Sequence, residues 1–269
     1  MESGRKKHQA CALRPTLWSL RPAGEHAGLR RAVQDAGLGL RVLPLQRLVA
    51  RPAGTALDDA LAAAIRIYSS PAAVRFALAA GARPGAEGVD LAVGAGTAAA
   101  LRAAGASNVR SPQRMDSEGL LALVELAQVQ GVAIGLVTAP RGRGMLAEAL
   151  GDRGAQLRVA EVYERQALHG GARRLADFID SDQGVLLASS SEALGLLLGH
   201  LPPAESRRGR RLRDRPAVAS SVRLATLLRA EGFRDVRLAA APTPAALVQA
   251  AIAPSLYTDR AAASRAPVD

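Results

Sequence analysis

A short unit that repeats along the chain constrains the fold more than any other feature of the sequence. In residues 91–105, LAVGAGTAAALRAAG, an apolar run ends in a turn of small residues, Thr97 opens a helix rich in alanine and leucine, and Gly105 ends it. Strands that alternate with helices in this way indicate βαβ units and parallel sheets. The sequence therefore predicts an α/β fold.

The same order of elements returns from one end of the chain to the other. The apolar runs predicted to be strands cover residues 12–20, 38–45, 65–68, 91–93, 132–137, 185–187, 217–219 and 236–239. Four glycines follow a predicted helix and precede an extended run, namely Gly37, Gly105, Gly154 and Gly232. Because a residue without Cβ adopts a left-handed backbone without strain, we expect a positive φ at each of them.

The turns that join a strand to a helix should gather at one edge of each sheet, because right-handed crossovers place them there. These turns contain Arg21, Ser70, Gly96, Thr97, Arg143, Ser190 and Ser221. The first N–H groups of a helix have no partner within the helix and carry a partial positive charge, so an anion can bind there. Serine and threonine are also ordinary N-caps, and one alone is weak evidence for a site. Several on one edge could jointly hold a ligand with several anionic groups.

The charge of the chain also favours an anionic ligand. Its 269 residues include 35 basic and 24 acidic side chains, which gives a formal net charge of +11, and a positive field of this size attracts anions. A solvated surface rich in arginine is the alternative interpretation. The densest basic run, RRGRRLR at residues 207–213, has no aromatic residues nearby for stacking on bases. We therefore interpret it as a solvated loop rather than a nucleic-acid site.

Several classes of protein are not expected from this sequence. Cys11 is the single cysteine, which excludes an internal disulfide, and the four histidines lack the spacing of metal ligands, so we expect no metal centre. Residues 1–9 are basic, but the apolar segment typical of a signal peptide does not follow them. An uncharged apolar run of about 18 residues, uninterrupted by proline, is also missing. We expect a soluble cytoplasmic protein that binds neither membrane nor nucleic acid.

Residues 94–99, GAGTAA, match the dinucleotide-binding pattern G-x-G-x-x-A. That pattern normally opens the first βαβ unit, whereas this one lies far into the chain. The acidic residue expected about 20 positions later would be Asp116, which we place in a loop rather than at the end of a strand. An NAD(P)-dependent oxidoreductase is therefore an alternative that rests on this pattern alone.

Motifs distributed over residues 12–250 together carry a resemblance to one family. They are WSLRPAG at residues 18–24, YSSPAAV at 68–74, AVGAGTAAAL at 92–101, DSEGLL at 116–121, the glycine-terminated segment 142–154, VYER at 162–165, the serines at 189–190 and SVRLA at 221–225. In their order and spacing the chain resembles the uroporphyrinogen-III synthase family. It departs from that family in the opening strand, where Ser19 and Leu20 precede Arg21 in place of the usual Val-Thr.

The resemblance implies two flavodoxin-like α/β lobes with parallel sheets, joined by a two-stranded β-ladder. Lobe one would be discontinuous and comprise residues 12–42 and 167–255, and lobe two would comprise residues 53–157. The linker ladder would comprise residues 43–52 and 158–166. The tails, residues 1–11 and 256–269, are expected to be disordered.

The reaction that the resemblance implies is that of a cyclising hydro-lyase in haem and sirohaem biosynthesis. Its substrate is hydroxymethylbilane, a linear octacarboxylate tetrapyrrole. The substrate loses water and closes, with inversion of ring D, to give uroporphyrinogen III. The resemblance implies no cofactor and no metal. It also implies a monomeric enzyme whose substrate could be handed over by hydroxymethylbilane synthase.

The same resemblance assigns roles to individual residues. Tyr163 is expected to be the acid that protonates the departing hydroxyl, since a phenol with a pKa near 10 still carries its proton at neutral pH. The residues expected to bind substrate are Arg21, Ser69, Ser70, Ala72, Gly96, Thr97, Arg143, Ser189, Ser190, Ser221 and Arg223. One alternative from another class is a two-lobed protein that binds small anions without catalysis. In that case Tyr163 is an ordinary half-buried aromatic of a strand predicted over residues 159–165.

Overall fold

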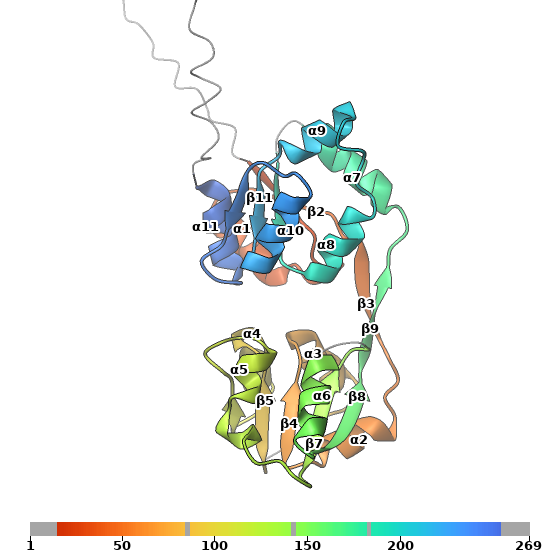
Figure 1. Cartoon of the computed structure of the whole chain (residues 1–269), viewed down its shortest axis with the longest axis vertical. Helices are drawn as coiled ribbons and strands as arrows, with labels where there is room; N and C mark the ends of the chain where they lie inside the picture. Colours follow the sequence, from red (N-terminus) through yellow and green to blue (C-terminus); the bar gives the residue numbers. More distant parts are fainter. Residues whose placement is uncertain (1–14, 84–86, 141–143, 182–183, 254–269) are drawn as a thin grey trace, which may run out of the picture. The chain divides into compact units, whose positions relative to one another are not determined.

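Parallel sheets flanked by helices form both halves of the chain, as the repeated strand–turn–helix unit predicts (Figure 1). The structure, a computed structural model, describes residues 15–83, 87–140, 144–181 and 184–253. The chain divides into unit 1, which comprises residues 1–47 and 167–269, and unit 2, which comprises residues 48–166. The predicted fold class, with two parallel sheets and a two-stranded ladder, is confirmed.

The sheet of unit 1 is five-stranded and parallel, with the order β12-β11-β10-β1-β2. Its strands are β1 (Thr16–Ser19), β2 (Gly39–Val42), β10 (Val185–Ala188), β11 (Ala217–Ala219) and β12 (Val236–Leu238). Numbered along unit 1, this is the flavodoxin order 2-1-3-4-5. The order reverses between β1 and β10, and ligands of open α/β sheets bind outside the carboxyl ends of the strands at such a switch point.

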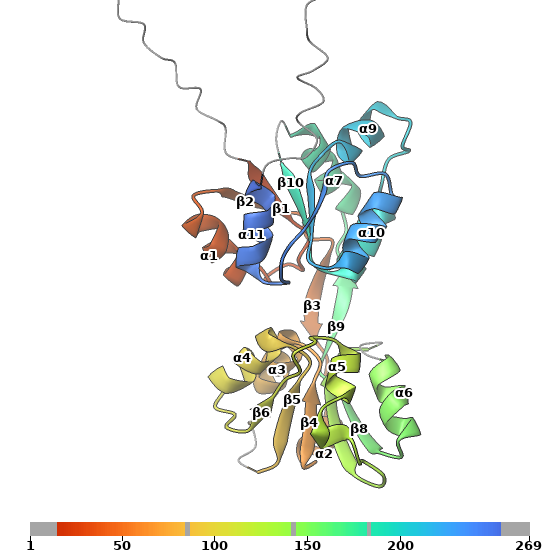
Figure 2. The same cartoon turned by 60° about the vertical axis from the view of Figure 1, so that its left-hand side comes forward.

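Helices cover both faces of this sheet (Figure 2). The helices are α1 (Ala27–Asp35) and α11 (Pro244–Ile252) on one face, and α7 (Gly171–Asp180), α8 (Ser191–Leu198), α9 (Arg207–Arg213) and α10 (Val222–Ala230) on the other. Successive residues of a strand point to opposite faces. Val185 and Leu187 of β10 therefore join the core beneath α1 and α11, while Leu186 and Ala188 join the core beneath the other four helices.

The sheet of unit 2 is also five-stranded and parallel, with the order β6-β5-β4-β7-β8. Its strands are β4 (Ile65–Tyr68), β5 (Val89–Ala92), β6 (Val109–Arg110), β7 (Ala133–Thr138) and β8 (Gln156–Glu161). Numbered along unit 2, the order is 3-2-1-4-5, so the two units share the layered arrangement but differ in strand order. The switch point of unit 2 lies between β4 and β7.

Two sets of helices enclose the sheet of unit 2. They are α2 (Thr55–Leu61), α3 (Pro71–Ala79) and α4 (Ala95–Ala103) on one face, and α5 (Ser117–Leu121), the 3-10 helix η1 (Val124–Leu126) and α6 (Gly144–Asp152) on the other. The prediction that Thr97 opens a helix is wrong, because Gly94 is the N-cap and Thr97 lies within the first turn. The prediction that Asp116 lies in a loop and not at a strand end is confirmed, and its carboxylate accepts from the Gly119 N–H at 2.8 Å and thereby caps α5.

A buried ion pair joins the two central strands of unit 2. Arg66 of β4 lies opposite Asp90 of β5, and its Nε donates to Oδ1 of that carboxylate at 2.6 Å. Arg66 also donates to the carbonyl oxygens of Ala63 and Glu87, at 3.1 Å and 2.9 Å. Both charged side chains are almost fully buried, so each depends on the other to offset the cost of leaving water.

The chain passes from one unit to the other along two strands that pair with each other, β3 (Gln46–Ala50) and β9 (Tyr163–Ala167). The Leu168 N–H donates to the Leu45 carbonyl at 2.8 Å, and the Arg51 N–H donates to the Val162 carbonyl at 3.0 Å. As the residue number rises along one strand it falls along the other, so the ladder is antiparallel.

The single strand predicted over residues 159–165 is wrong, because the chain changes partners at Val162. The Val162 N–H still donates to the carbonyl of Thr138, the last residue of β7, at 3.0 Å. The Val162 carbonyl, by contrast, accepts from the backbone N–H of Arg51, which follows β3. β8 thus belongs to the sheet of unit 2, and Tyr163 is the first residue of β9.

The predicted helix-ending glycines all have a left-handed backbone. The φ angles are 65° at Gly37, 95° at Gly105, 77° at Gly154 and 87° at Gly232. The prediction is therefore confirmed at all four positions. Among the helices of the described residues, none combines the length and the apolar character needed to cross a membrane.

Candidate functional site

The turn after β4, at the switch point of unit 2, is tied down by its own hydrogen bonds. The N–H of the buried Ser69 donates to the Val137 carbonyl of β7 at 3.1 Å. Ser70 has an extended backbone, and its Oγ accepts from the Ala73 N–H at 3.1 Å. Pro71 follows as the first residue of α3, a position where its missing N–H costs nothing. The sequence Ser-Ser-Pro therefore produces a rigid turn at the carboxyl end of β4.

Tyr163 meets this turn from the start of β9. Its hydroxyl lies 3.0 Å from the Oγ of Ser70, and Nη2 of Arg165 donates to the phenol oxygen at 3.3 Å. The Tyr163 ring stacks on Phe76 of α3, with centroids 5.2 Å apart and an interplanar angle of 13°. Tyr163 lies in a strand, as predicted, but only 2% of it is exposed, so the prediction that it is half-buried is wrong. Both the ring and the hydroxyl are held in one orientation.

Arg165 belongs to the VYER motif, but no catalytic or binding role was predicted for it, although a sequence signal for one exists. Residues i and i+2 of a strand point to the same face. An arginine two positions after the tyrosine is therefore expected beside it. In the structure the Arg165 guanidinium carbon also lies 5.5 Å from the centroid of the Tyr163 ring. Arg165 is exposed, so its charge is in contact with solvent while it reaches the buried phenol.

The start of α4 lies beside the start of α3. A Cβ on Gly96 would approach the Pro71 side chain to 3.6 Å, which brings the two helix N-termini close together. Thr97 is 3% exposed, and Ala72 in the first turn of α3 is also buried. Ser69, Ser70, Ala72, Gly96 and Thr97 are therefore grouped at the carboxyl edge of one sheet, as the alternation of strands and helices predicts.

The dinucleotide pattern at residues 94–99 follows β5, the second strand of unit 2, and not β4 at the switch point. The acidic residue that the pattern requires about 20 positions later would be Asp116, and its carboxylate is already engaged in other contacts. Asp116 accepts from Gly119 and also receives Nε of Arg114 at 2.6 Å. Neither the position of the glycines nor the acidic residue fits the nucleotide site of a Rossmann fold, so the geometry disfavours the oxidoreductase alternative.

Five of the predicted residues lie on the corresponding edge of unit 1, namely Arg21, Ser189, Ser190, Ser221 and Arg223. Ser190 caps α8 by accepting from the Ala193 N–H at 3.3 Å, and Ser221 caps α10 by accepting from the Leu224 N–H at 3.4 Å. Ser189 precedes the first of these caps, and Arg223 is exposed in the first turn of α10. Because β1, β10 and β11 are adjacent and parallel, these turns and Arg21 share one edge of the sheet.

The predicted residues thus form two sets, one in each unit. Arg21 follows β1, and burial lowers the pKa of its guanidinium, an effect that the Glu25 carboxylate partly offsets. Arg143 lies outside the described residues. Within the described part of the chain, no group of three or more His, Cys, Asp and Glu side chains could hold a metal ion.

The loop predicted for residues 207–213 is wrong, because these residues form α9. Ser206 caps the helix through the Gly209 N–H at 2.9 Å. Arg211 donates to the carbonyls of Asp180 and Ser181, at 3.4 Å and 3.2 Å, at the end of α7. Carbonyl groups at a helix C-terminus carry partial negative charge, so arginines there stabilise the packing of the two helices. The basic run is therefore partly structural.

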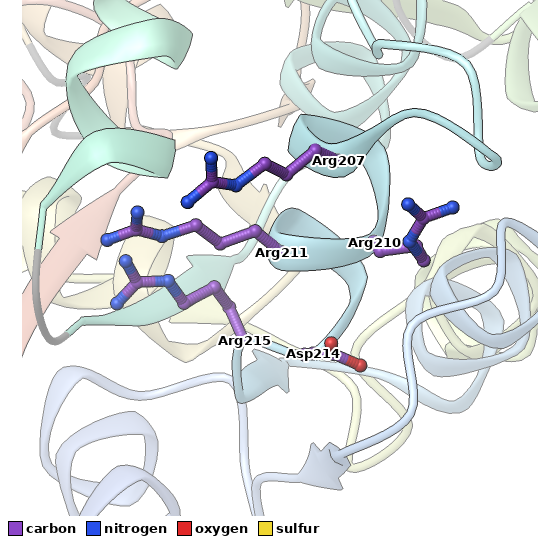
Figure 3. Close-up of a pocket in the computed structure, with 5 residues that line it drawn as sticks. All are labelled: Arg207, Arg210, Arg211, Asp214 and Arg215. Atoms are coloured by element: carbon purple, nitrogen blue, oxygen red, sulfur yellow. The ribbon is translucent and has the colours of Figure 1, made fainter.

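A hollow of about 510 Å³ lies beside α9 (Figure 3). The residues that line it are Arg207, Arg210, Arg211, Asp214 and Arg215. Figure 3 shows Arg207, Arg211 and Arg215 extending to the same side, while Arg210 extends to the other. Arg215 also donates to the carbonyls of Ile179 and Ser181. The hollow is thus framed by side chains that tie α9 to α7.

Comparison with known proteins gives a consistent result. The family model described as uroporphyrinogen-III synthase HemD matches residues 28–249. A uroporphyrinogen-III synthase of Salmonella typhimurium is 35% identical over 150 residues, and that of Escherichia coli K12 is 33% identical over 150 residues. Each match spans 55% of this chain and 60% of the relative's length.

Two solved structures share the fold. A mutant uroporphyrinogen III synthase from the extremely thermophilic bacterium Thermus thermophilus aligns with a TM-score of 0.58 at 18% identity, covering 93% of this chain and 100% of that one. A uroporphyrinogen-III synthetase from Helicobacter pylori aligns with a TM-score of 0.59 at 14% identity, covering 89% and 98%. At these identities the likeness concerns the fold alone.

Proposed function

This chain belongs to the uroporphyrinogen-III synthase HemD family, and on that premise we propose that it converts hydroxymethylbilane into uroporphyrinogen III. The reaction breaks the C–O bond of the terminal hydroxymethyl group, releases water and closes the macrocycle with ring D inverted. The net charge of +11 suits a substrate that is an octacarboxylate. The reaction requires no redox partner, because atoms are only rearranged and one water is lost.

The observation that carries this proposal is the hydrogen-bonded group of Tyr163, Ser70 and Arg165 at the switch point of unit 2. In the proposed mechanism Tyr163 donates its proton to the departing hydroxyl, which leaves as water and generates an azafulvene. Arg165 donates to the phenol oxygen at 3.3 Å and stabilises the negative charge that this oxygen gains. Ser70 orients the Tyr163 hydroxyl, and Ser70 is itself held in place because its Oγ caps α3.

The remaining steps depend more on how the enzyme positions the two ends of the substrate than on acid–base catalysis. The substituted carbon of ring D attacks the methylene carbon of the azafulvene and forms a spiro intermediate. The bond from that ring carbon to its original bridging carbon then breaks, and the freed bridging carbon is bonded by the other α-carbon of ring D, which leaves the ring inverted. Rearomatisation of the pyrrole then releases one proton, which restores the proton that Tyr163 gave up. The enzyme must hold the two ends of the chain together before the spontaneous closure without inversion takes place.

The turns at the two sheet edges are proposed to bind the substrate carboxylates. Helix N-termini at α3, α4, α8 and α10 present N–H groups with partial positive charge. The proposed binding residues are Arg21, Ser69, Ser70, Ala72, Gly96, Thr97, Arg143, Ser189, Ser190, Ser221 and Arg223. We also propose that the enzyme acts as a cytoplasmic monomer. Direct handover from hydroxymethylbilane synthase would shorten the time available for spontaneous closure.

The test is to incubate the full chain with hydroxymethylbilane and to separate the uroporphyrin isomers by chromatography after oxidation. We expect the type III isomer to predominate without any added cofactor, whereas a sample without protein gives the type I isomer. A product that is only type I, formed at the rate of the protein-free sample, would support a non-catalytic anion-binding protein. A requirement for NAD(P) would support the oxidoreductase.

A further inference from the structure

The turn after β1, residues 21–26, occupies the switch point of unit 1 and leads directly into α1. It is held beside the first residue of β3. The Ala23 N–H donates to the Gln46 carbonyl at 2.9 Å, and Ala23 forms a parallel bridge with Arg47. Gln46 and the turn are therefore brought together from distant parts of the sequence at the edge of the sheet where α/β proteins bind ligands.

Buried nitrogen atoms without partners are concentrated at this turn. Among the described residues, the buried side-chain nitrogens that lack a hydrogen-bond partner are Nε1 of Trp18, Nε of Arg21, Nε2 of His26 and Nε2 of Gln46. Three of these four atoms belong to the turn or to the residue hydrogen-bonded to it. His26 is 4% exposed and Gln46 is 3% exposed. Native proteins seldom leave buried polar atoms unpaired, so these nitrogens mark a place where a ligand or an ordered water can bind.

The N-terminus of α1 contributes further N–H groups that no side chain caps. His26 is the N-cap residue, but its side chain makes no capping hydrogen bond, and the first turn of the helix contains no acidic residue. In the same unit, a Ser or Thr hydroxyl caps the N-termini of α8, α9, α10 and α11, whereas α7, like α1, has no side-chain cap. The first N–H groups of α1 thus keep their partial positive charge without a side-chain acceptor.

The charges around the turn favour a single anionic group. Burial lowers the pKa of His26, the positive charges of Arg30 and Arg21 lower it further, and Glu25 opposes them. His26 is therefore a neutral hydrogen-bonding group at neutral pH, and Arg21 supplies the local charge. The positive charges of Arg21 and Arg30 act on His26 against the single negative charge of Glu25, so the charge balance around His26 is positive.

We propose that Arg21, His26 and Gln46 form a binding site for one carboxylate of the linear tetrapyrrole and of its cyclised product. The inference rests on the proposed function and extends it to His26 and Gln46. Gln46 would contribute its amide N–H, and Arg21 its Nε–H. The neutral imidazole of His26 would contribute its Nε2–H. A planar carboxylate with two oxygens can accept from several such donors at once.

The test uses Gln46→Leu, which removes the amide at nearly constant volume. Binding of uroporphyrinogen III, kept reduced under anaerobic conditions, is measured by calorimetry alongside the melting temperature. We expect the Kd to rise about tenfold, the effect of losing a hydrogen bond to a charged group. The melting temperature should stay the same or rise, because an apolar side chain replaces an unpaired donor. Gln46→Glu should weaken binding further, since its carboxylate repels that of the ligand.

The matched control is Trp18→Phe, which removes the fourth unpaired nitrogen in the same unit. The Trp18 indole lies against Phe178 and Gly184, at the opposite end of β10 from the turn. Its substitution should leave the Kd unchanged. The inference is overturned if Gln46→Leu and Gln46→Glu bind with the wild-type Kd, whether or not their melting temperatures change.

This failure can be told apart from failure of the proposed function. If the wild-type protein forms the type III isomer while both Gln46 variants bind product normally, only the carboxylate site is wrong. If the wild-type protein neither forms the type III isomer nor binds uroporphyrinogen III, the proposed function fails, and with it the inference.

Discussion

The turns that follow the first strands of the two units occupy the same topological position but use their polar groups in opposite ways. In unit 2, Ser70 caps α3 and also contacts the hydroxyl of Tyr163, and Ser69 is tied to β7. In unit 1, buried nitrogens of Arg21, His26 and Gln46 have no partner among the described residues. The serines of one turn are hydrogen-bonded within the protein, whereas the other turn has buried nitrogens without a partner.

This difference suggests a division of labour between the units. A turn held by hydrogen bonds of this kind can keep an acid such as Tyr163 in one orientation for proton transfer. A turn with unpaired buried donors is stabilised when a ligand supplies the acceptors. On this account the Ser70 turn of unit 2 also orients the reacting group, whereas the turn after β1 in unit 1 contributes only binding energy for the substrate.

The largest expected effect concerns the buried pairing inside unit 2. Asp90→Ala leaves the guanidinium of Arg66 buried without its carboxylate, and we expect the free energy of unfolding of unit 2 to fall by about 3–5 kcal/mol. Denaturation should be followed by circular dichroism, which reports both units, and by fluorescence of Trp18, the single tryptophan, which lies in unit 1. The circular dichroism transition should move to lower denaturant more than the fluorescence transition.

The matched control for this variant is Asp214→Ala, which breaks the exposed pair with Arg234. Exposed pairs contribute about 0–1 kcal/mol, so this change should have little effect. If Asp90→Ala lowers the free energy of unfolding no more than Asp214→Ala does, the buried pair of Arg66 and Asp90 does not stabilise unit 2 as proposed.

A smaller effect should distinguish unit 2 at alkaline pH. Burial raises the pKa of Tyr68 to about 12, with a further increase from Asp90 and an opposing decrease from Arg66. The unfolded chain loses this proton near pH 10. The stabilising contribution is therefore complete below pH 10 and is lost as the pH rises from about 10 to 12, a loss of about 2 kcal/mol.

Tyr68→Phe should abolish this component of the pH dependence. The measurement is the free energy of unfolding by urea at a series of pH values between about 9 and 12. Equal alkaline slopes in the wild-type protein and in Tyr68→Phe would show that Tyr68 does not titrate differently in the folded and unfolded states. Burial of Tyr68 at the end of β4 would then raise the pKa of its hydroxyl less than the structure indicates.

Much of the fold could be predicted from the sequence because its signals are local. The strands at residues 65–68 and 217–219 match the structure at both ends, since short apolar runs bounded by turn residues are typical of buried strands. The change of partners at Val162 could not be predicted, because it depends on pairing with β3. The helix at residues 207–213 was missed because arginines that contact the carbonyls of α7 are recognised only in three dimensions.

The candidate site was less accessible to sequence reasoning. Ser70 and Tyr163 are 93 positions apart, and only the family resemblance connected them before the structure placed them 3.0 Å apart. Their roles in binding and catalysis stay predictions. His26 and Gln46 carry no sequence signal at all, because what marks them is burial without a partner.

The division of labour is tested most directly by steady-state kinetics of Tyr163→Phe and Gln46→Leu, measured side by side on hydroxymethylbilane. Tyr163→Phe keeps the ring stacked on Phe76 but removes the proton donor, so we expect kcat to fall about 10²-fold or more with little change in KM. Gln46→Leu should raise KM about tenfold and leave kcat nearly unchanged. A Tyr163→Phe enzyme with wild-type kcat, or two variants that change the same parameter, would contradict the account.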